Sequence, residues 1–268
     1  MVRLADARLT LAPLTNFDVG ALAAAAIAYV AFRAGLLTAG GALAAFFVGA
    51  VTFGTLGAAG ASVLLLFFVT SSALSRLGRA RKRTVADVPK TGPRDGAQVL
   101  ANGGVAAVCA LLVLTGDPRY AAAFAGAFAA ANADTWGTEL GLLARGTPRS
   151  ILTWRRIAPG LSGGVTIQGT LAEVAGAVAI AICAALFGLA SVYAVFIGGV
   201  AGALVDSLLG ASVQSLRWCS QCRSACETDP HRCGANTSPL RGLSWLGNDA
   251  VNAACTATGA LVAFALAR

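Results

Sequence analysis

Charged residues are scarce in this chain of 268 residues, where they make up only 12% of the sequence. Soluble domains carry about 25% charged residues, so a chain with half that share cannot cover a soluble surface. Together with a hydrophobic content of 57%, this scarcity excludes an ordinary soluble protein and predicts an integral membrane protein. The stretch Met1–Leu14 lacks an apolar core and a cleavage site, so no signal peptide is expected.

Small residues, by contrast, are abundant, with 32 glycines and many alanines. Small side chains let transmembrane helices approach each other closely, which favours a tightly packed bundle. The net charge of +8 could indicate a nucleic-acid partner, but the basic residues lie in short loops between apolar runs. That pattern indicates membrane orientation and contacts with anionic lipid headgroups or phosphates, and we expect no nucleic-acid partner.

Apolar runs of spanning length, or close to it, predict an all-α fold, a polytopic transmembrane bundle of about seven or eight helices. The runs cover residues 18–37, 39–57, 59–75, 97–115, 120–144, 164–188, 190–213 and 245–267. The second and third are separated by little more than Gly57–Gly60, so their boundary is the least defined. No internal repeat is visible, and residues 1–268 are expected to form a single transmembrane domain.

Basic residues concentrate in three loops, 76–94, 145–156 and 217–241, and two spans separate each loop from the next. The three loops therefore lie on one side, which the positive-inside rule identifies as the cytoplasm. We expect a multi-pass protein of the cell's inner or plasma membrane with its active site facing the cytoplasm. Residues 214–243 would form a cytoplasmic loop between the last two spans.

Acidic residues stand near the cytoplasmic ends of several spans, although an acid at such a depth costs roughly 2.5–3.5 kcal/mol on insertion scales. Four carboxylates and an amide would converge on one membrane face: Asp134, Glu139, Asp206, Asp249 and Asn248. A functional site explains this coincidence better than acids that simply reach interfacial water. Two alternatives stay open, an N-cap-type role for Asp249 and an interfacial role for Asp134.

Spacing along the helices refines this picture. Asp206 follows Gly198 and Gly202 at intervals of four, so it lies on a small-residue stripe that faces the bundle interior. Asp134 and Glu139 are about 140° apart around a helix, so they share a cleft only loosely unless the helix breaks at Gly137. Glu173, about ten residues into the sixth run, is expected near mid-membrane and is given no catalytic role.

Two further stretches could bind phosphate on the same face. Ser162 and Gly163 lead into the sixth run, which starts with Gly164 and contains Thr166, and a glycine turn before a helix presents backbone N–H groups to an anion. Arg94, Gln98 and Asn102 would form one polar ridge at the start of the fourth run and hold a second anionic group. Asn248 and Asn252, which share a face of the eighth run, would instead support metal or nucleotide. The alternatives are an ordinary turn and a solvated loop with a snorkelling arginine.

Five of the seven cysteines lie between residues 219 and 233, beside the single histidine. The Cys-x-x-Cys and His-x-Cys spacings predict a structural zinc site made of Cys219, Cys222, His231 and Cys233. Cys226 could replace one of these ligands, and a redox pair or an iron–sulfur site remains an alternative. Disulfides are not expected in a reducing compartment.

These motifs together resemble a family of integral membrane proteins that includes the plant phytyl-phosphate kinase. The matching stretches are Arg94–Gly103, Asp134–Gly141, Pro159–Thr166, Asp206–Ala211 and Asn248–Asn252. The resemblance runs from about residue 40 to the C-terminus, and the layout is more distantly similar to that of dolichol and phytol kinases. Those kinases use a nucleoside triphosphate, typically CTP, at the cytoplasmic membrane face.

The resemblance and the residues together predict a membrane-embedded phosphotransferase that converts an isoprenyl monophosphate, such as phytyl or geranylgeranyl phosphate, to the diphosphate. CTP or another nucleoside triphosphate would be the donor, with Asp134, Glu139, Asp206 and Asp249 as Mg²⁺ ligands or catalytic groups. Membrane lipid and the two substrates are the expected partners, and the sequence leaves an oligomer open.

Three alternatives to this phosphotransferase remain. A kinase for the free prenyl alcohol and a lipid-phosphate cytidylyltransferase would use the same groups. An ion-coupled transporter would use the acids as an ion path, but it usually shows inverted repeats and sites near mid-membrane.

Overall fold

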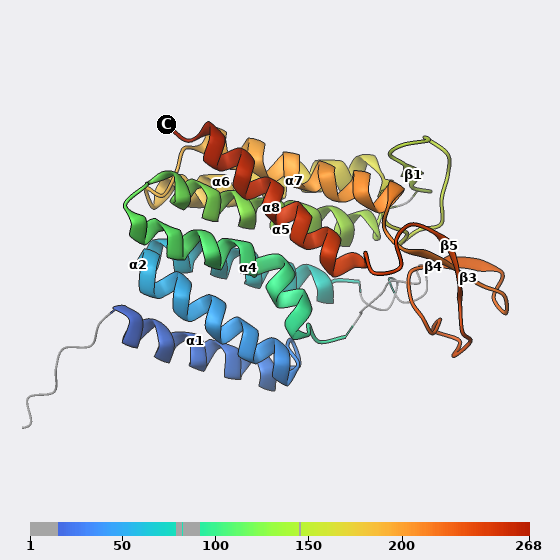
Figure 1. The fold of residues 1–268 in the computed structure, drawn as a ribbon, viewed down its shortest axis with the longest axis horizontal. Helices are drawn as coiled ribbons and strands as arrows, with labels where there is room; N and C mark the ends of the chain where they lie inside the picture. The colour runs from blue at the N-terminus through green and yellow to red at the C-terminus, as the bar shows by residue number, and fades with distance from the viewer. Residues whose placement is uncertain (1–15, 79–81, 83–91, 145) are drawn as a thin grey trace, which may run out of the picture.

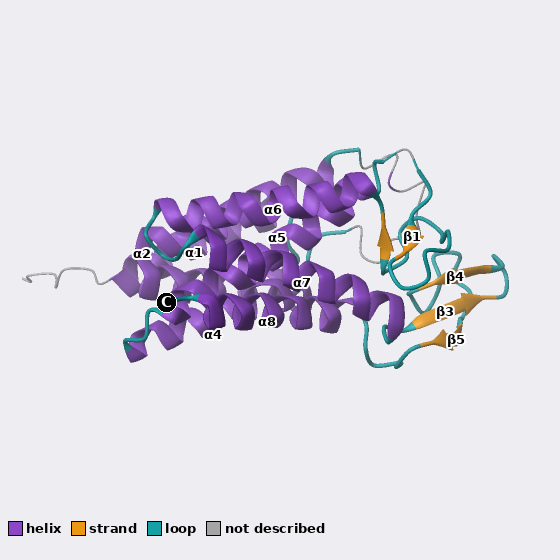
Figure 2. Cartoon of the chain, turned by 90° about the horizontal axis from the view of Figure 1, so that it is seen from above, coloured by secondary structure: helices purple, strands orange, loops and turns teal. Residues whose placement is uncertain are grey.

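The computed structural model describes residues 16–78, 82, 92–144 and 146–268. This part of the chain is largely helical, with short strands gathered at one end of the bundle (Figures 1 and 2). The seven α-helices of the described residues are α1 (Asn16–Arg33), α2 (Ala39–Arg76), α4 (Gly96–Leu112), α5 (Arg119–Gly141), α6 (Ile167–Leu186), α7 (Val192–Ser212) and α8 (Asn248–Leu266).

The long helix α2 is a helical hairpin that turns back at Gly57 (Figure 1). Gly57 has φ 56° and ψ −145°, a conformation that residues with a Cβ atom rarely adopt. Both ends of α2 meet Arg94: its carbonyl accepts a hydrogen bond from the N–H of Thr38 (3.0 Å), and its guanidinium donates to Ser72 Oγ (3.3 Å). The expected boundary between the second and third apolar runs lies at this glycine.

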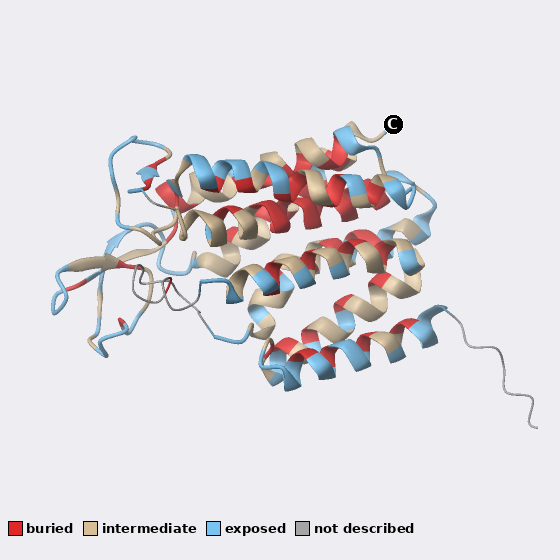
Figure 3. Ribbon diagram, turned by 180° about the vertical axis from the view of Figure 1, so that it is seen from behind, coloured by how far each residue is buried: buried red, intermediate tan, exposed pale blue. Residues whose placement is uncertain are grey.

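Six helices of the described residues are long and apolar enough to cross a membrane, namely α1, α2, α4 with its 3₁₀ extension, α6, α7 and α8. Because α2 reverses at Gly57, its two halves supply two antiparallel segments. Helix α5 is the centre of the bundle and packs against α2, α4, α6, α7 and α8. Its stretch from Ala121 to Ala133 is buried throughout, as the red ribbon in Figure 3 shows. The all-α membrane bundle predicted from the apolar runs is confirmed.

Glycines let the central helices approach at backbone distance. A Cβ atom on Gly198 would lie 2.6 Å from the carbonyl oxygen of Gly259 in α8, and one on Gly202 would lie 2.6 Å from that of Cys255. Real Cβ atoms essentially never come this close, so both positions require glycine. The small-residue stripe of α7 therefore packs against α8, with Asp206 one turn further along.

A buried amide joins three helices just beside the acids. Asn132 is fully buried in α5; its amide donates to the carbonyl oxygen of Gly176 in α6 (2.9 Å), and its Oδ1 accepts from Thr70 in α2 (3.2 Å). Trp136 donates in turn to the Thr70 hydroxyl (3.2 Å). Since each buried polar group has a partner, this network fixes how α5 sits between α2 and α6.

The loops that follow α5 and α7 gather at one end of the bundle, where α4, α6 and α8 begin; we call it the loop end (Figure 2). Strand β1 (Arg149–Ser150) pairs with β2 (Gly164–Val165), and β3 (Leu216–Cys219) lies between β4 (Ser224–Cys226) and β5 (Ser238–Arg241). Arg241 of β5 donates to the carbonyl oxygens of Gly210 and Ala211, which lie in the last turn of α7. The small sheet is thereby fastened to the helix that carries Asp206.

Candidate active site

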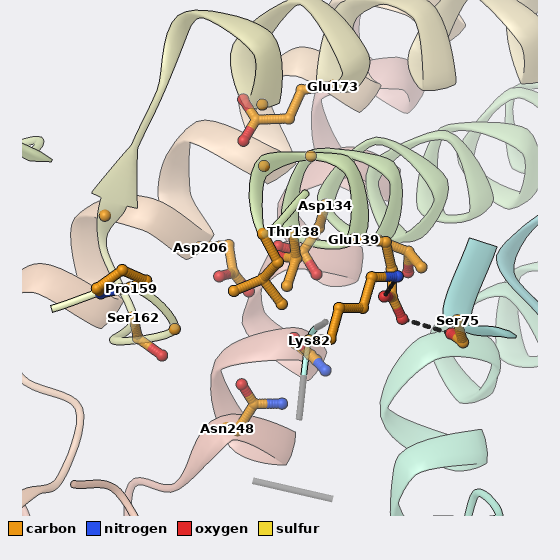
Figure 4. A pocket seen from close by; sticks show the side chains of 18 of the residues that line it. Ser75, Lys82, Asp134, Thr138, Glu139, Pro159, Ser162, Glu173, Asp206 and Asn248 are labelled. Carbon is orange, nitrogen blue, oxygen red and sulfur yellow. Dashed lines mark hydrogen bonds and ion pairs between the residues drawn. The ribbon is translucent and has the colours of Figure 1, made fainter. Parts of the chain in front are cut away.

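A polar cavity of about 300 Å³ opens at the loop end between α2, α4, α5, α6, α7 and α8 (Figure 4). Most residues singled out in the sequence line it: Arg94, Gln98, Asn102, Asp134, Glu139, Ser162, Gly163, Gly164, Thr166, Asp206, Asn248 and Asn252. Asp249, next to Asn248, does not line it. The structure thus brings together groups that are up to 158 residues apart in sequence, from Arg94 to Asn252.

Two of the acids that line the cavity, Asp134 and Asp206, are neighbours in space. Their side chains, from α5 and α7, lie next to each other in the cavity, as Figure 4 shows. Oδ2 of Asp206 is buried, and no group in the described part of the chain donates a hydrogen bond to it. Two carboxylates cannot both keep their charge at this separation, so the pair requires a shared proton or a bound cation.

Glu173 of α6 is a third acid of the same cavity, on the far side of α5 in Figure 4. It packs against Gly137, where a Cβ atom would collide with its side chain. Helix α5 runs unbroken through Gly137, so the proposed helix break is wrong, and the glycine instead makes room for the acid. Helix α6 begins only at Ile167, because Gly164–Val165 form a strand. Glu173 therefore lies in the second turn, closer to the loop end than the sequence suggested.

Glu139 points away from this acid pair. Its carboxylate accepts a hydrogen bond from Ser75 Oγ (2.5 Å) and forms an ion pair with Lys82 Nζ (2.5 Å). The Lys82 side chain is 6% exposed and that of Glu139 is 19% exposed, so this ion pair is largely out of water. The spacing of five residues from Asp134 separates the two acids around α5, as expected. Lys82 and Ser75 had no signal of their own in the sequence.

Arg94, Gln98 and Asn102 line the cavity at and just before the start of α4. Burial lowers the pKa of the Arg94 guanidinium, while the nearby Glu139 charge acts in the other direction. The Gln98 side chain accepts a hydrogen bond from the N–H of Asp95 (3.1 Å), and Asp95 accepts from the N–H of Gln98 (2.9 Å), a capping box that starts α4. Asn102 donates to the Gln98 carbonyl (3.0 Å). The capping box holds Gln98 in place, whereas Arg94 precedes the N-cap Asp95 and donates to Ser72. The predicted helical ridge of three residues is therefore wrong for Arg94, although all three line the cavity.

The turn at Ser162 meets a carboxylate of the Cys/His loop. Glu227 accepts hydrogen bonds from the N–H of Ser162 (2.6 Å) and from its hydroxyl (2.9 Å). Gln214 donates to both the Ser162 hydroxyl and Glu227 (2.9 Å each). Burial raises the pKa of Glu227, opposed by these hydrogen bonds. The Ser162 donors, which the sequence analysis assigned to a phosphate, therefore bind the Glu227 side chain in this structure.

The glycines and the threonine after Ser162 have defined structural roles. Gly163 has φ +77°, and a Cβ atom there would collide with Ala211 of α7. Only glycine fits this position, which brings the turn against α7. Thr166 is the N-cap of α6 and accepts a hydrogen bond from the N–H of Gly169 (3.0 Å). The short strand β2 lies between the turn and α6, so the turn itself is not the N-terminus of the helix.

The start of α8 completes the cavity with amides. Asn248 and Asn252 are one turn apart and both line it. The N-cap of α8 is Gly247, so the alternative N-cap role does not fall to Asp249, which lies in the first turn. A carboxylate in the first turn interacts favourably with the helix dipole.

The Cys/His loop brings four candidate ligands together. One ligand atom from each of Cys219, Cys222, His231 and Cys233 lies within 4.8 Å of the others. The sulfurs of Cys219 and Cys233 are 3.7 Å apart, and Nδ1 of His231 is 3.1 Å from the Cys233 sulfur. The hydrogen bond with His231 lowers the pKa of Cys233 to about 6. Cys226 points elsewhere, with its sulfur 3.8 Å from the Thr228 carbonyl.

Comparison with known proteins connects this architecture to a family. The family described as "Integral membrane protein DUF92" matches residues 22–260. Protein PGR of Arabidopsis thaliana is 32% identical over 256 residues, which cover 84% of this chain and 87% of that protein. The uncharacterized membrane protein MJ0933 of Methanocaldococcus jannaschii is 38% identical over 56% of this chain and 63% of its own length.

A third relative shows lower identity. Protein VTE6, chloroplastic, of Arabidopsis thaliana is 25% identical over 85% of this chain and 64% of its own length. No solved structure matches the chain. Every part of the polar cavity lies within the residues that match the family.

Proposed function

The chain belongs to the integral membrane family DUF92, and from this membership we propose that it is a membrane-embedded phosphotransferase. The reaction transfers a phosphoryl group from CTP or another nucleoside triphosphate to an isoprenyl monophosphate and yields the isoprenyl diphosphate. The similarity to VTE6 and the resemblance of the cavity motifs to those of the plant phytyl-phosphate kinase support this reaction class.

The Asp134–Asp206 pair is the observation that carries the proposal. Asp206 Oδ2 is buried without a donor among the described residues and faces a second carboxylate, which is the environment of a cation ligand. Carboxylate and amide oxygens suit Mg²⁺, and Glu173, Asn248 and Asn252 supply more of them in the same cavity. These residues fit Mg²⁺, which when bound would neutralise charge on the phosphate oxygens.

The remaining groups divide the work of phosphoryl transfer. An oxygen of the acceptor monophosphate attacks the γ-phosphorus of the donor, and the bond from that phosphorus to the nucleoside diphosphate breaks. Because the attacking oxygen is already anionic, no strong general base is needed, and the single histidine lies in the Cys/His loop. Arg94 would hold one phosphate group, and Lys82, positioned by Glu139, would provide a second cationic group.

The turn at Ser162 would exchange partners on substrate binding. Its N–H and hydroxyl donate to Glu227 in the structure, and a phosphate oxygen would take the place of that carboxylate. Asp249, outside the cavity, would act only through the start of α8. We place the cavity on the cytoplasmic side, where nucleoside triphosphates are available and where the basic loops should lie.

The experiment uses purified protein in lipid nanodiscs with Mg²⁺ and either α- or γ-labelled CTP. Acceptors are prenyl alcohols and prenyl monophosphates, and Asp206→Asn serves as the inactive control. Transfer of the γ-label to a monophosphate is the expected result. Transfer to the alcohol would identify an alcohol kinase, and transfer of the α-label a cytidylyltransferase. If folded protein transfers neither label to any acceptor with CTP or ATP, the proposal is wrong.

We also propose that Cys219, Cys222, His231 and Cys233 bind a structural zinc ion. A tetrahedron with zinc–sulfur distances of about 2.3 Å places two sulfurs about 3.8 Å apart, close to the 3.7 Å between Cys219 and Cys233. Purified protein should contain one zinc per chain, and Cys222→Ser should lose it, whereas Cys226→Ser should keep it. Metal analysis that finds no zinc in a folded preparation would contradict this assignment.

A further inference from the structure

A second cavity, of about 120 Å³, lies between α1, the two halves of α2, α4 and α5. Its walls are almost entirely apolar and rich in small residues, among them Ala23, Ala28, Ala45 and Gly49. At one end the lining changes to polar side chains. Arg94, Gln98, Asn102 and Thr135 line this groove and also the polar cavity. The apolar groove therefore adjoins the polar cavity at these four side chains.

The groove follows α1 away from the loop end. Along this helix its lining runs from Ala31, near Arg94, to Gly20. Eleven residue steps at about 1.5 Å each give a length of roughly 16 Å, about half of a bilayer's hydrocarbon core. Phe53 packs against Gly20, where a Cβ atom would lie 3.0 Å from its ring, and both residues line the groove. Phe53 therefore forms the far wall.

We infer that this groove binds the hydrocarbon chain of the isoprenyl substrate and that Phe53 limits its length, an inference that rests on the proposed function. An isoprenyl phosphate has a charged head and an apolar tail, and the two adjoining cavities match it. The region around Arg94 is cationic and lined by amides, and the groove beside it is apolar. Alanines and glycines on three helices leave width for a methyl-branched chain. The position of the groove beside the polar cavity favours the substrate chain over an ordinary membrane lipid as its occupant.

The groove makes one side of α1 sensitive to side-chain size. Ala23 lines the groove and is half-buried, whereas Ala25, two residues along the same helix, is exposed and does not line it. Ala23→Leu should therefore raise KM for geranylgeranyl phosphate by about tenfold or more and leave geranyl phosphate nearly unchanged. Ala25→Leu is the matched control and should keep the wild-type chain-length profile. Phe53→Ala should admit chains longer than the wild type accepts.

A binding measurement separates this inference from the proposed reaction. A prenyl phosphate with a diazirine at its tail end should label residues of α1 and α2 around Gly20 and Phe53 in the wild-type protein, with or without nucleotide. An unlabelled prenyl phosphate should prevent the labelling, and a diazirine phospholipid should label this site poorly.

The outcomes are distinct. If the wild type phosphorylates prenyl phosphates but Ala23→Leu and Ala25→Leu share its chain-length profile, the groove is not the chain site, although the function stands. Labelling confined to other helices, or equal labelling by the phospholipid, would also overturn the inference. Labelling at Phe53 without any turnover would support the groove and contradict the proposed reaction.

Discussion

At the scale of single residues, Asp134 and Asp206 should be needed for activity but lower the stability of the metal-free protein. The two acids face each other in a buried place, and Oδ2 of Asp206 has no donor in the described part of the chain. Active sites commonly hold such unfavourable groups, because binding of the ligand offsets their cost. The pair is therefore a weak point of the fold as long as no cation is bound.

Replacing Asp206 with asparagine should stabilise the metal-free protein and inactivate it. The substitution removes one of two confronting charges, so the melting temperature in a chelator should rise by about 3 °C or more. Activity should fall by at least about 100-fold, because the phosphate charge loses its stabilisation. Thermal melts with and without Mg²⁺ test both points: Mg²⁺ should stabilise the wild type and leave the variant unchanged. A lower melting temperature of the variant in the chelator would argue against a strained pair.

The ion pair of Lys82 and Glu139 should respond differently. Glu139→Gln leaves the nearly buried Lys82 ammonium without its charge partner, which should lower the free energy of unfolding by about 3 kcal/mol. The double variant Lys82→Met with Glu139→Leu should recover most of that loss. Asp117→Asn, which removes an exposed ion pair with Arg119, is the control and should change little. Denaturant titration measures all three, and equal losses in Glu139→Gln and the control would refute a buried pair.

At the scale of elements, the reversal of α2 depends on one glycine. Gly57 combines φ 56° with ψ −145°, so Gly57→Ala should cost about 1–3 kcal/mol through backbone strain. Gly104 in α4 is the matched control, because a Cβ atom there meets nothing closer than 3.9 Å, and Gly104→Ala should cost nothing. Unfolding by titrated detergent compares the two. If both substitutions had the same small effect, the turn would not require glycine.

The elements show where sequence reasoning succeeds. Spans are predicted from apolar runs, and these runs identified the seven α-helices named above and the turn within α2, because burial in lipid requires continuous apolar sequence. The same reasoning placed Asp134 and Asp206 at one level, since both stand near the ends of helices that share a loop side.

Contacts between distant loops were beyond that reasoning. Glu227 meets Ser162 across 65 residues, and no local pattern encodes that pairing. Glu173 was misplaced because Gly164–Val165 join a strand pair with Arg149–Ser150, which shortens α6 at its start. Lys82 reaches Glu139 across 57 residues from a loop whose many basic residues looked equivalent. Tertiary pairing, not local preference, decides these positions.

At the scale of the whole molecule, the polar groups of the candidate site are concentrated at one end of the bundle. The cavity, the Cys/His loop and both small sheets lie at the loop end, while the opposite end carries the turn at Gly57 and the short connections after α4 and α6. Such polarity fits a protein that meets its water-soluble substrate on one side only.

Orientation in the membrane can be tested with protease sites. A recognition sequence inserted after Gly146 should be cut only in inside-out vesicles, because this loop should face the cytoplasm. One inserted after Asp117, between α4 and α5, should be cut only from the outside. Both positions are in connections between helices. Cleavage of the Gly146 insertion in intact cells would reverse the assigned orientation.

The hydrogen bonds between Glu227 and Ser162 also bear on how the protein is made. Synthesis proceeds from the N-terminus, so the turn at Ser162 emerges well before Glu227, and Asn248 and Asn252 follow later still. A nascent chain that has inserted seven of its eight apolar segments contains Asp134 and Asp206. It still lacks the amides of α8 and the Glu227 carboxylate that holds the turn at Ser162. Maturation of the site is therefore a late event of biosynthesis, and limiting zinc during growth should yield inserted but inactive protein.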